Sequence, residues 1–190
     1  MLRAGAKVSA VHAPAFDFSG AGFVPEFNWG LREGANAYLA ATSAPVRTLA
    51  EVIEFNDQDL PRFAPWGQDR LRDCLWSPLN EREARDLGRT NRQQARAYLL
   101  GLMDADDLDV LVGIDTLQSL IYPFAGFPAI AMPAGLSIGG VPFCVTFIGR
   151  PKSDPELLGM AYAFEQASQF RVPPELAPIA APCRRVAADR

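Results

Sequence analysis

The chain contains 190 residues, of which 49% are hydrophobic and 21% charged, and 22 acidic residues against 18 basic ones give a net charge of −4. This composition excludes extensive disorder, because it can form a packed core, and its acidic balance argues against a nucleic-acid partner. Since no apolar run has the length of a membrane span and the N-terminus carries no secretory signal, we expect a cytoplasmic protein without a membrane partner.

The first 25 residues predict the end of a helix, a strand and a loop. Residues 2–6 have the sequence of a last helical turn closed by glycine, and residues 7–11 that of a short strand. A domain rarely opens on a helix end, because so short a helix does not form alone. We therefore expect further sequence upstream of Met1 in the same domain. Prolines and glycines between positions 12 and 25 predict a loop.

Helices are predicted along the next 80 residues. One helix is expected from Glu26 to about Thr42, and a capping box at Thr48 and Glu51 opens another through Phe55. A short helix follows Gly67, and a long helix covers residues 80–103. Five arginines share one stripe of the long helix, at positions 82, 85, 89, 92 and 96. We interpret this stripe as a solvated face, and the alternative is a ridge that binds an anion or a partner.

Strands begin after Asp104. Residues 108–112, 129–132 and 143–149 predict strands, and residues 133–142 predict a turn. Ser153 and Glu156 have capping-box spacing and open a last helix. Helices alternating with strands place the chain in the α/β class. Residues 173–190 are expected to form a loosely ordered tail.

The residues alone supply no convincing catalytic set. Three cysteines are too few for a disulfide framework or a zinc site, and His12 is the only histidine. Gly135, Ser137 and Gly139 match the nucleophile-elbow pattern, but that device needs a following helix and here a strand follows, so we expect a hairpin turn. We expect neither a metal nor a cofactor.

An ordered series of motifs resembles the C-terminal part of the amidase-signature hydrolases. Residues 46–56 read VRTLAEVIEFN, similar to the family pattern R(S/T)LxxVIxFN, and residues 66–69 read WGQD, similar to FGQ(D/E). Residues 108–112 read LDVLV, similar to LDALV. The most specific likeness is AGFPAI at 125–130 followed by PAG, VPF and TFIG, and the helix AYAFEQA at 161–167 closes the series. The chain looks closest to the peptide-amidase-like members.

This resemblance implies a fold and a reaction. The fold would be α/β, a mixed sheet flanked by helices, with residues 1–172 as the C-terminal portion of the domain. The reaction would be hydrolysis of carbon–nitrogen amide bonds through an acyl-enzyme, with a Ser–cis-Ser–Lys triad and backbone N–H groups that hold the oxyanion. The family's Gly/Ser-rich signature and catalytic lysine have no match in this sequence, so we assign no catalytic residue. We expect the chain to be inactive alone.

Candidate substrate-binding residues follow the strand at 108–112, where α/β proteins build pockets and where the resemblance places the cleft. They are Ile114, Asp115, Thr116 and Tyr122. Many family members carry Pro-Thr where this chain carries Gly113 and Ile114, which leaves the substrate class open.

Two hypotheses about function follow. In the first, the chain is part of an amidase that acts on a small-molecule amide, completed by an N-terminal catalytic half or a homo-oligomer partner. The alternative is a noncatalytic binding or interaction module, or a subunit of a split enzyme. A piece of a larger domain should also expose apolar surface where the remainder packs.

Overall fold

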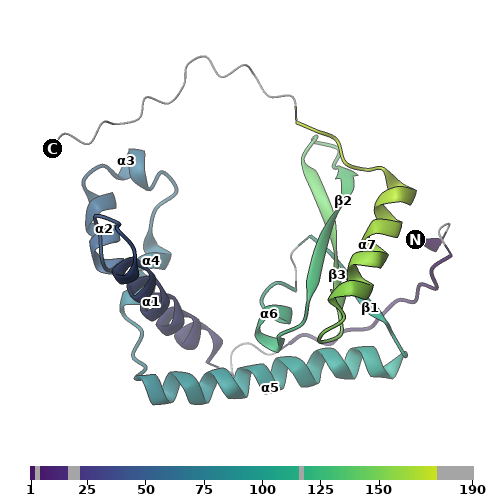
Figure 1. Ribbon diagram of the computed structural model, residues 1–190, viewed down its shortest axis with the longest axis horizontal. Helices are drawn as coiled ribbons and strands as arrows, with labels where there is room; N and C mark the ends of the chain where they lie inside the picture. The colour runs from purple at the N-terminus through teal and green to yellow at the C-terminus, as the bar shows by residue number, and fades with distance from the viewer. Residues whose placement is uncertain (3–4, 17–21, 116–117, 175–190) are drawn as a thin grey trace.

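The computed structural model describes residues 1–2, 5–16, 22–115 and 118–174, and it divides into a helical part and a sheet part joined by one long helix (Figure 1). The helical part contains α1 (Phe23–Ala41), α2 (Leu49–Asp57), α3 (Leu60–Phe63) and α4 (Asp69–Leu75). The long helix is α5 (Glu81–Ala105). The sheet part contains β1 (Val110–Ile114), α6 (Tyr122–Ala125), β2 (Ala129–Leu136), β3 (Pro142–Gly149) and α7 (Asp154–Ser168). This arrangement confirms the α/β class.

The described strands form one sheet in the order β1-β3-β2. Both pairs are antiparallel, and Phe147 of β3 lies opposite Val112 on one side and Ile130 on the other. We expected a mixed sheet, but the sheet in the described part of the chain is antiparallel. A short hairpin joins β2 to β3, as is possible only for an antiparallel pair. Strand β2 also runs through Pro133, where a turn was expected. Proline is tolerated there because β2 is an edge strand, and its register shifts between Pro133 and Gly135.

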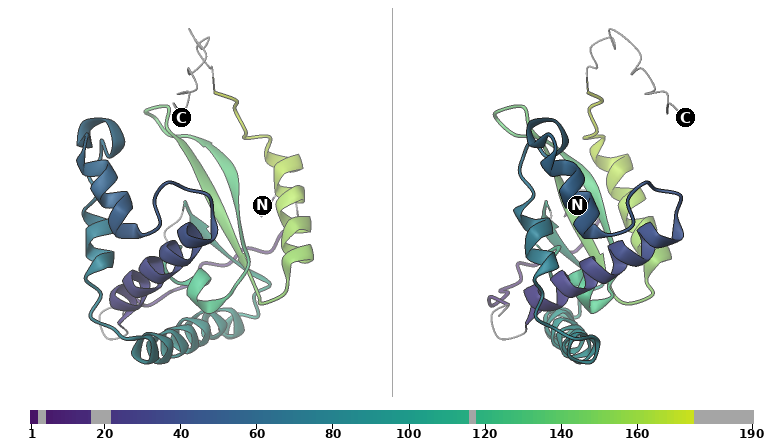
Figure 2. Two further views of the ribbon diagram at one scale, coloured as in Figure 1. Left: turned by 60° about the vertical axis from the view of Figure 1, so that its left-hand side comes forward. Right: turned by 90° about the vertical axis from the view of Figure 1, so that its left-hand side faces the viewer.

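The main hydrophobic core lies where α5 crosses beneath the sheet. Ala95, Leu99 and Met103 recur every four residues on α5 and are fully buried, as an amphipathic helix requires. They pack against residues of α1, β3 and the segment around α6, namely Phe23, Ile148, Ile121, Ala125 and Phe127. On the opposite face of the sheet, Phe147 meets Phe164 of α7 edge to face at 5.4 Å. Helix α7 and helices α1–α4 thus lie on different sides of the sheet (Figure 2).

A second, smaller core holds the helical part together. It consists of Leu49 and Ile53 of α2 and Cys74 of α4, with Ala35, Leu71 and Leu75 packed around them. Burial raises the pKa of the Cys74 thiol, and Asp73 beside it adds to the rise. The thiol therefore stays protonated at neutral pH and acts as a small apolar side chain.

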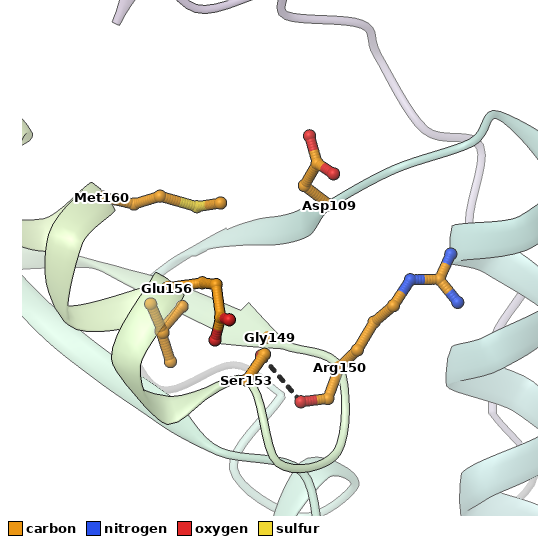
Figure 3. A pocket seen from close by; sticks show the side chains of 7 residues that line it. Asp109, Gly149, Arg150, Ser153, Glu156 and Met160 are labelled. Atoms are coloured by element: carbon orange, nitrogen blue, oxygen red, sulfur yellow. Dashed lines mark hydrogen bonds between the residues drawn. The ribbon is translucent and has the colours of Figure 1, made fainter.

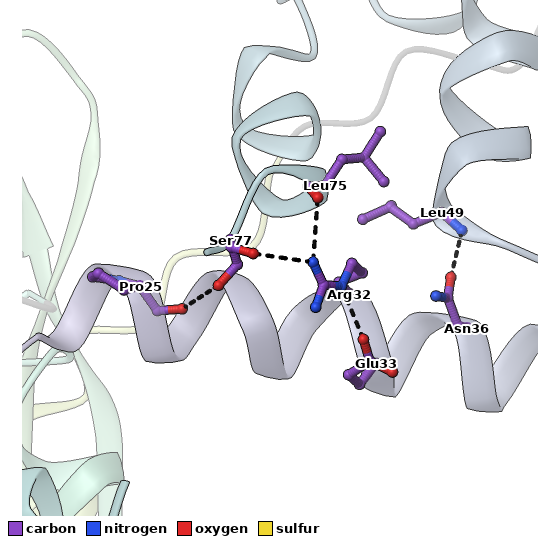
Figure 4. A network of polar contacts seen from close by, with 7 residues as sticks. All are labelled: Pro25, Arg32, Glu33, Asn36, Leu49, Leu75 and Ser77. Carbon is purple, nitrogen blue, oxygen red and sulfur yellow. Dashed lines mark hydrogen bonds and ion pairs between the residues drawn. The ribbon is translucent and has the colours of Figure 1, made fainter. Parts of the chain in front are cut away.

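Polar contacts fasten the helices of this part to one another (Figure 4). The guanidinium of Arg32 on α1 donates to the carbonyls of Leu75 and Ser77, at 3.2 and 3.3 Å. Farther along α1, the backbone N–H of Leu49 donates to Oδ1 of Asn36 at 2.8 Å. These contacts satisfy backbone groups at the end of α4 and the start of α2, which have no intrahelical partner.

Helix α1 meets α5 where the half-buried Glu26 lies beside Gly88 and Asn91. A side chain at Gly88 would put its Cβ 3.2 Å from Oε1 of Glu26, so the glycine makes room for this carboxylate. Oε2 of Glu26 and both side-chain polar atoms of Asn91 are buried without a hydrogen-bond partner among the described residues. Burial raises the pKa of Glu26, and the neighbouring Asn91 opposes that rise without reaching hydrogen-bond geometry.

Three predictions about local structure have different outcomes. Thr48 caps α2 as expected, because its side chain accepts from the N–H of Glu51 at 3.2 Å. The capping box predicted at Ser153 is wrong: its hydroxyl donates instead to the carbonyl of Arg150 at 2.7 Å. The strand predicted at residues 7–11 is also absent, since those residues form no regular structure.

The arginine stripe of α5 is exposed along its whole length, as a solvated face would be. Arg85 pairs with Glu81 at 2.6 Å, and Arg89 pairs with Asp86 at 2.5 Å. Arg96 lies over the ring of Phe127, 5.7 Å from its centre. In the described part of the chain, no helix has the length and hydrophobicity needed to cross a membrane.

Candidate functional site

The predicted substrate contact Asp115 is tied to the sheet. It follows β1 directly and has a φ of 49°, in the left-handed region that Asp and Asn tolerate better than most residues. Its backbone N–H donates to the carbonyl of Cys144 at 2.8 Å, and its Oδ1 accepts from the N–H of Cys144 at 2.9 Å. The hydroxyl of Thr146 donates to the carbonyl of Asp115. Asp115 therefore fixes the turn after β1, with one carboxylate oxygen already engaged.

The other candidates lie in different environments. Ile114 is 61% exposed at the end of β1, which leaves its side chain open to a ligand or a partner. Tyr122 begins α6 and packs partly buried against the main core. Thr116 lies outside the described residues. The structure thus places Ile114 and Asp115 side by side at the strand end, while Tyr122 sits closer to the core.

Gln118 is a residue that the sequence interpretation missed. A Cβ on Gly113 would lie 2.1 Å from Oε1 of Gln118, so this glutamine occupies the space that any side chain at position 113 would need. Oε1 of Gln118 is buried without a hydrogen-bond partner among the described residues. The signal in the sequence is the glycine itself, because glycine inside a strand often marks a close approach of other atoms.

A small cavity of about 150 Å³ lies at the start of α7 (Figure 3). Asp109, Arg150, Ser153 and Glu156 line it together with apolar groups. The guanidinium of Arg150 is already engaged: it pairs with Asp104 of α5 at 2.7 Å and donates to the carbonyl of Leu108, just after α5, at 3.3 Å. The hydroxyl of Ser153 donates to the carbonyl of Arg150 at 2.7 Å. The contacts of Arg150 and Ser153 stabilise the β3–α7 connection.

Ser137 lies in a hairpin turn, as the sequence predicted. Its N–H donates to the carbonyl of Val141 at 2.8 Å, and its hydroxyl accepts from the N–H of Val141 at 3.1 Å. A strand precedes it and another follows, so the strand–turn–helix geometry of a nucleophile elbow is not present here. Within the described ranges, no three His, Cys, Asp or Glu side chains gather closely enough to hold a metal ion.

Comparison with known proteins relates the chain to amidases, although no family model matches it. It is 34% identical over 144 residues to an Arabidopsis thaliana protein named a probable amidase, covering 74% of this chain and 28% of the plant protein. It is 41% identical over 80 residues to a Glutamyl-tRNA(Gln) amidotransferase subunit of Roseobacter denitrificans, covering 42% of this chain and 16% of the bacterial protein.

Solved structures agree with these sequence relatives. The crystal structure of an amidase family protein from Bacillus anthracis matches with a TM-score of 0.73 and 27% identity, over 90% of this chain and 33% of that one. The native peptide amidase of Stenotrophomonas maltophilia matches with a TM-score of 0.68 and 26% identity, over 83% of this chain and 35% of the peptide amidase.

The fold and its relatives define an α/β protein with the architecture of the amidases. The chain is similar in sequence to a probable amidase and an amidotransferase subunit and in structure to amidases, and its partial coverage of them is what a C-terminal portion would give. It spans about 28% of the length of the plant relative and 16% of that of the amidotransferase relative.

Proposed function

We propose that this chain is the C-terminal portion of an amidase that hydrolyses carbon–nitrogen amide bonds, and that the 190 residues alone are inactive. The observation that carries the proposal is the structural match: a TM-score of 0.73 over 90% of this chain accounts for only 33% of the Bacillus anthracis protein. The reaction would follow the acyl-enzyme route of the family, which needs a nucleophile, a base and an oxyanion hole. We assign none of these three roles to a residue of this chain.

In this proposal the chain contributes one wall of the substrate cleft. Ile114 would present its exposed side chain to a small-molecule amide, and the fixed turn at Asp115 would hold that side chain in place. The free oxygen of Asp115, together with Thr116 and Tyr122, would supply the remaining contacts.

A second candidate function is that of a noncatalytic interaction module. Arg82 and Arg92 favour it, because both are exposed and neither takes part in an ion pair with another described residue. They could bind an acidic partner through the ridge of α5. A charge run on a helix is more commonly a solvated face, so we place the amidase proposal first.

The test is an activity assay on simple amide substrates, measured as release of ammonia or amine. The purified chain should give no hydrolysis above the uncatalysed rate. A mixture of the chain with an N-terminal amidase-signature fragment from the same genome should restore it, whereas the fragment alone should not. Hydrolysis by the chain alone would contradict its expected inactivity, and a silent mixture of two folded components would favour the interaction module.

A further inference from the structure

An open hollow interrupts the arginine stripe of α5. It has a volume of about 350 Å³ and is lined by Arg85, Gly88, Arg89 and Arg92. Residues three and four positions apart are neighbours on a helix surface, so Arg85 and Arg92 flank Gly88 on one face. Because glycine has no side chain, the space between the two arginines stays open. Three of the five arginines of the stripe therefore border one hollow, which a uniform solvated face would not show.

Two of these arginines are oriented by acidic neighbours on the same helix. Oε1 of Glu81 accepts from Nε and Nη2 of Arg85 at 2.9 and 2.6 Å, and Oδ1 of Asp86 accepts from Nη2 of Arg89. A guanidinium carries five N–H donors, so both arginines keep donors for a second acceptor. Ion pairs this exposed contribute little stability. They nevertheless favour one side-chain direction, which lowers the entropy lost when a ligand binds.

The third arginine of the hollow lies against the connection between α6 and β2. A Cβ on Gly126 would lie 3.7 Å from Nη1 of Arg92, so this guanidinium lies beside the glycine that ends α6. One turn farther along α5, Arg96 lies over the ring of Phe127 in the same connection. The position of Arg92 is therefore set by packing between α5 and the sheet part, and all three arginines of the hollow have contacts that orient them.

The excess of positive charge along the stripe suits an anion. Arg82, Arg92 and Arg96 form no ion pair with another described residue, although the whole chain carries a net charge of −4. Planar guanidinium groups pair bidentately with the oxygens of phosphate groups. The helix axis rises about 10 Å from position 85 to position 92. A ligand with two linked phosphoryl groups spans this distance better than a single phosphate does.

One acidic side chain lies close to the hollow and opposes an anion there. The carboxylate of Glu26 lies behind Gly88, where a Cβ on that glycine would be 3.2 Å from its Oε1. It is half-buried, and burial raises its pKa, which favours the uncharged acid. No ion pair joins it to an arginine in the described part of the chain. The guanidinium groups of the hollow are therefore not neutralised by this carboxylate.

We propose that the hollow between Arg85, Arg89 and Arg92 binds a diphosphate group, either as free pyrophosphate or as part of a nucleoside diphosphate. Neither source takes part in the proposed amide hydrolysis, so the inference goes beyond that function and does not depend on it. It also differs from the second candidate function, because the ligand is a small anion in one hollow and Arg82 is not part of the site.

Isothermal titration calorimetry of the 190-residue chain with inorganic pyrophosphate tests the proposal, at low ionic strength because salt screens exposed charges. Pyrophosphate should bind at one site per chain, and inorganic phosphate should bind about tenfold more weakly, because it offers fewer charge-assisted hydrogen bonds. ADP distinguishes the two sources: binding at least as tight as that of pyrophosphate supports a nucleoside diphosphate, and weaker binding supports the free anion. No binding of pyrophosphate, or equal binding of pyrophosphate and phosphate, would overturn the inference.

Single arginine substitutions compare the hollow with the rest of the stripe. Arg92→Gln should weaken pyrophosphate binding about tenfold, the loss expected for one charge-assisted contact. Arg82→Gln removes the same charge from the same helix outside the hollow and should weaken binding less than about twofold, because the charge is exposed and screened. Arg85→Gln asks the same question if Arg92→Gln disturbs the packing at Gly126. Equal losses in Arg82→Gln and Arg92→Gln would overturn the inference, since charge alone would then attract the anion.

Two further measurements locate the ligand and separate the inference from the proposed functions. The side-chain Nε–H signals of Arg85, Arg89 and Arg92 should shift in NMR spectra on adding pyrophosphate, whereas that of Arg70 on α4 should not. A polyglutamate peptide that binds more tightly than pyrophosphate would assign the ridge to an acidic partner and overturn the inference. Pyrophosphate binding without amide hydrolysis in the mixture would support the inference while counting against the amidase. Hydrolysis without pyrophosphate binding would do the reverse.

Discussion

Asn56 and Gln68 join α2 to the start of α4 through a hydrogen bond of 3.0 Å from Nδ2 of Asn56 to Oε1 of Gln68. The amide nitrogen of Gln68 donates in turn to Oδ1 of Asp57 at 2.7 Å and to the carbonyl of Ile53 at 3.3 Å. Both residues come from motifs that resemble the family patterns, and the structure gives both a role in packing. The similarity of these two positions to the family patterns therefore indicates a shared fold and not a shared catalytic role.

Replacing Gln68 by alanine should lower the free energy of unfolding by about 1–3 kcal/mol, because it leaves buried polar groups around Ile53 unpaired. Urea denaturation followed by circular dichroism measures the change. Gln94→Ala on the exposed face of α5 is the control and should stay within about 0.5 kcal/mol of the original. Equal effects of the two substitutions would show that the Gln68 network does not stabilise the helical part.

Gly113→Ala should destabilise the chain by about 1–3 kcal/mol, because the new methyl group would collide with Gln118. Combining it with Gln118→Ala should recover much of the loss, since the second change removes the colliding atom. Gly159→Ala on α7 is the control: its Cβ would meet nothing within 4 Å and should be neutral or stabilising. A double-mutant cycle from thermal unfolding gives the coupling, and additive effects would show that the two positions do not interact.

Asp115→Ala should cost about 1–2 kcal/mol of stability, because it removes the acceptor of the Cys144 N–H and puts alanine at a positive φ. Asp115→Asn should cost much less, since asparagine tolerates this conformation and keeps an acceptor oxygen. Chemical denaturation of the two variants compares them. In the complete enzyme that we propose, loss of substrate affinity in the stable Asn variant would indicate that the charge of Asp115 contacts the substrate.

Glu26 should make the chain less stable as the pH rises. Burial raises its folded-state pKa above the ordinary value of 4.5, so the folded chain keeps a proton that the unfolded chain has already released. Stability attributable to this group is therefore full below pH 4.5, declines as the pH rises through the folded pKa, and stays low above it. Glu26→Gln should flatten this decline in urea denaturation between pH 4 and 7. Glu54→Gln, on the exposed side of α2, should retain it.

Much of the fold can be predicted from the sequence, because the signals are local. The buried stripe at Ala95, Leu99 and Met103 sets α5, and the predicted strands at 129–132 and 143–149 fall within β2 and β3. The predicted turn at 133–142 begins too early, since β2 continues to Leu136. Pro133 indicates a break in an interior strand, but an edge strand tolerates proline. Edge position depends on pairing with distant residues, which no local pattern reveals.

The candidate site is predicted less well, for the same reason. Its position at the end of β1 follows from the strand and the resemblance, and Ile114 and Asp115 do lie there. The contact between Gln118 and Gly113 depends on the path of the chain after β1. The hydrogen bond from the N–H of Cys144 to Asp115 depends on the register between β1 and β3. Both contacts depend on tertiary structure, and the hydrogen bond between Cys144 and Asp115 joins residues that are 29 positions apart in the sequence.

The smaller core around Leu49, Ile53 and Cys74 has a consequence for cooperativity. Helices α2, α3 and α4 bury only three residues fully and pack mainly on α1 and on one another. Opening them would leave the contacts among α5, α6 and β3 intact. The chain thus contains two units of unequal resistance to local unfolding. We expect helices α2–α4 to unfold first while α5 and the sheet stay folded.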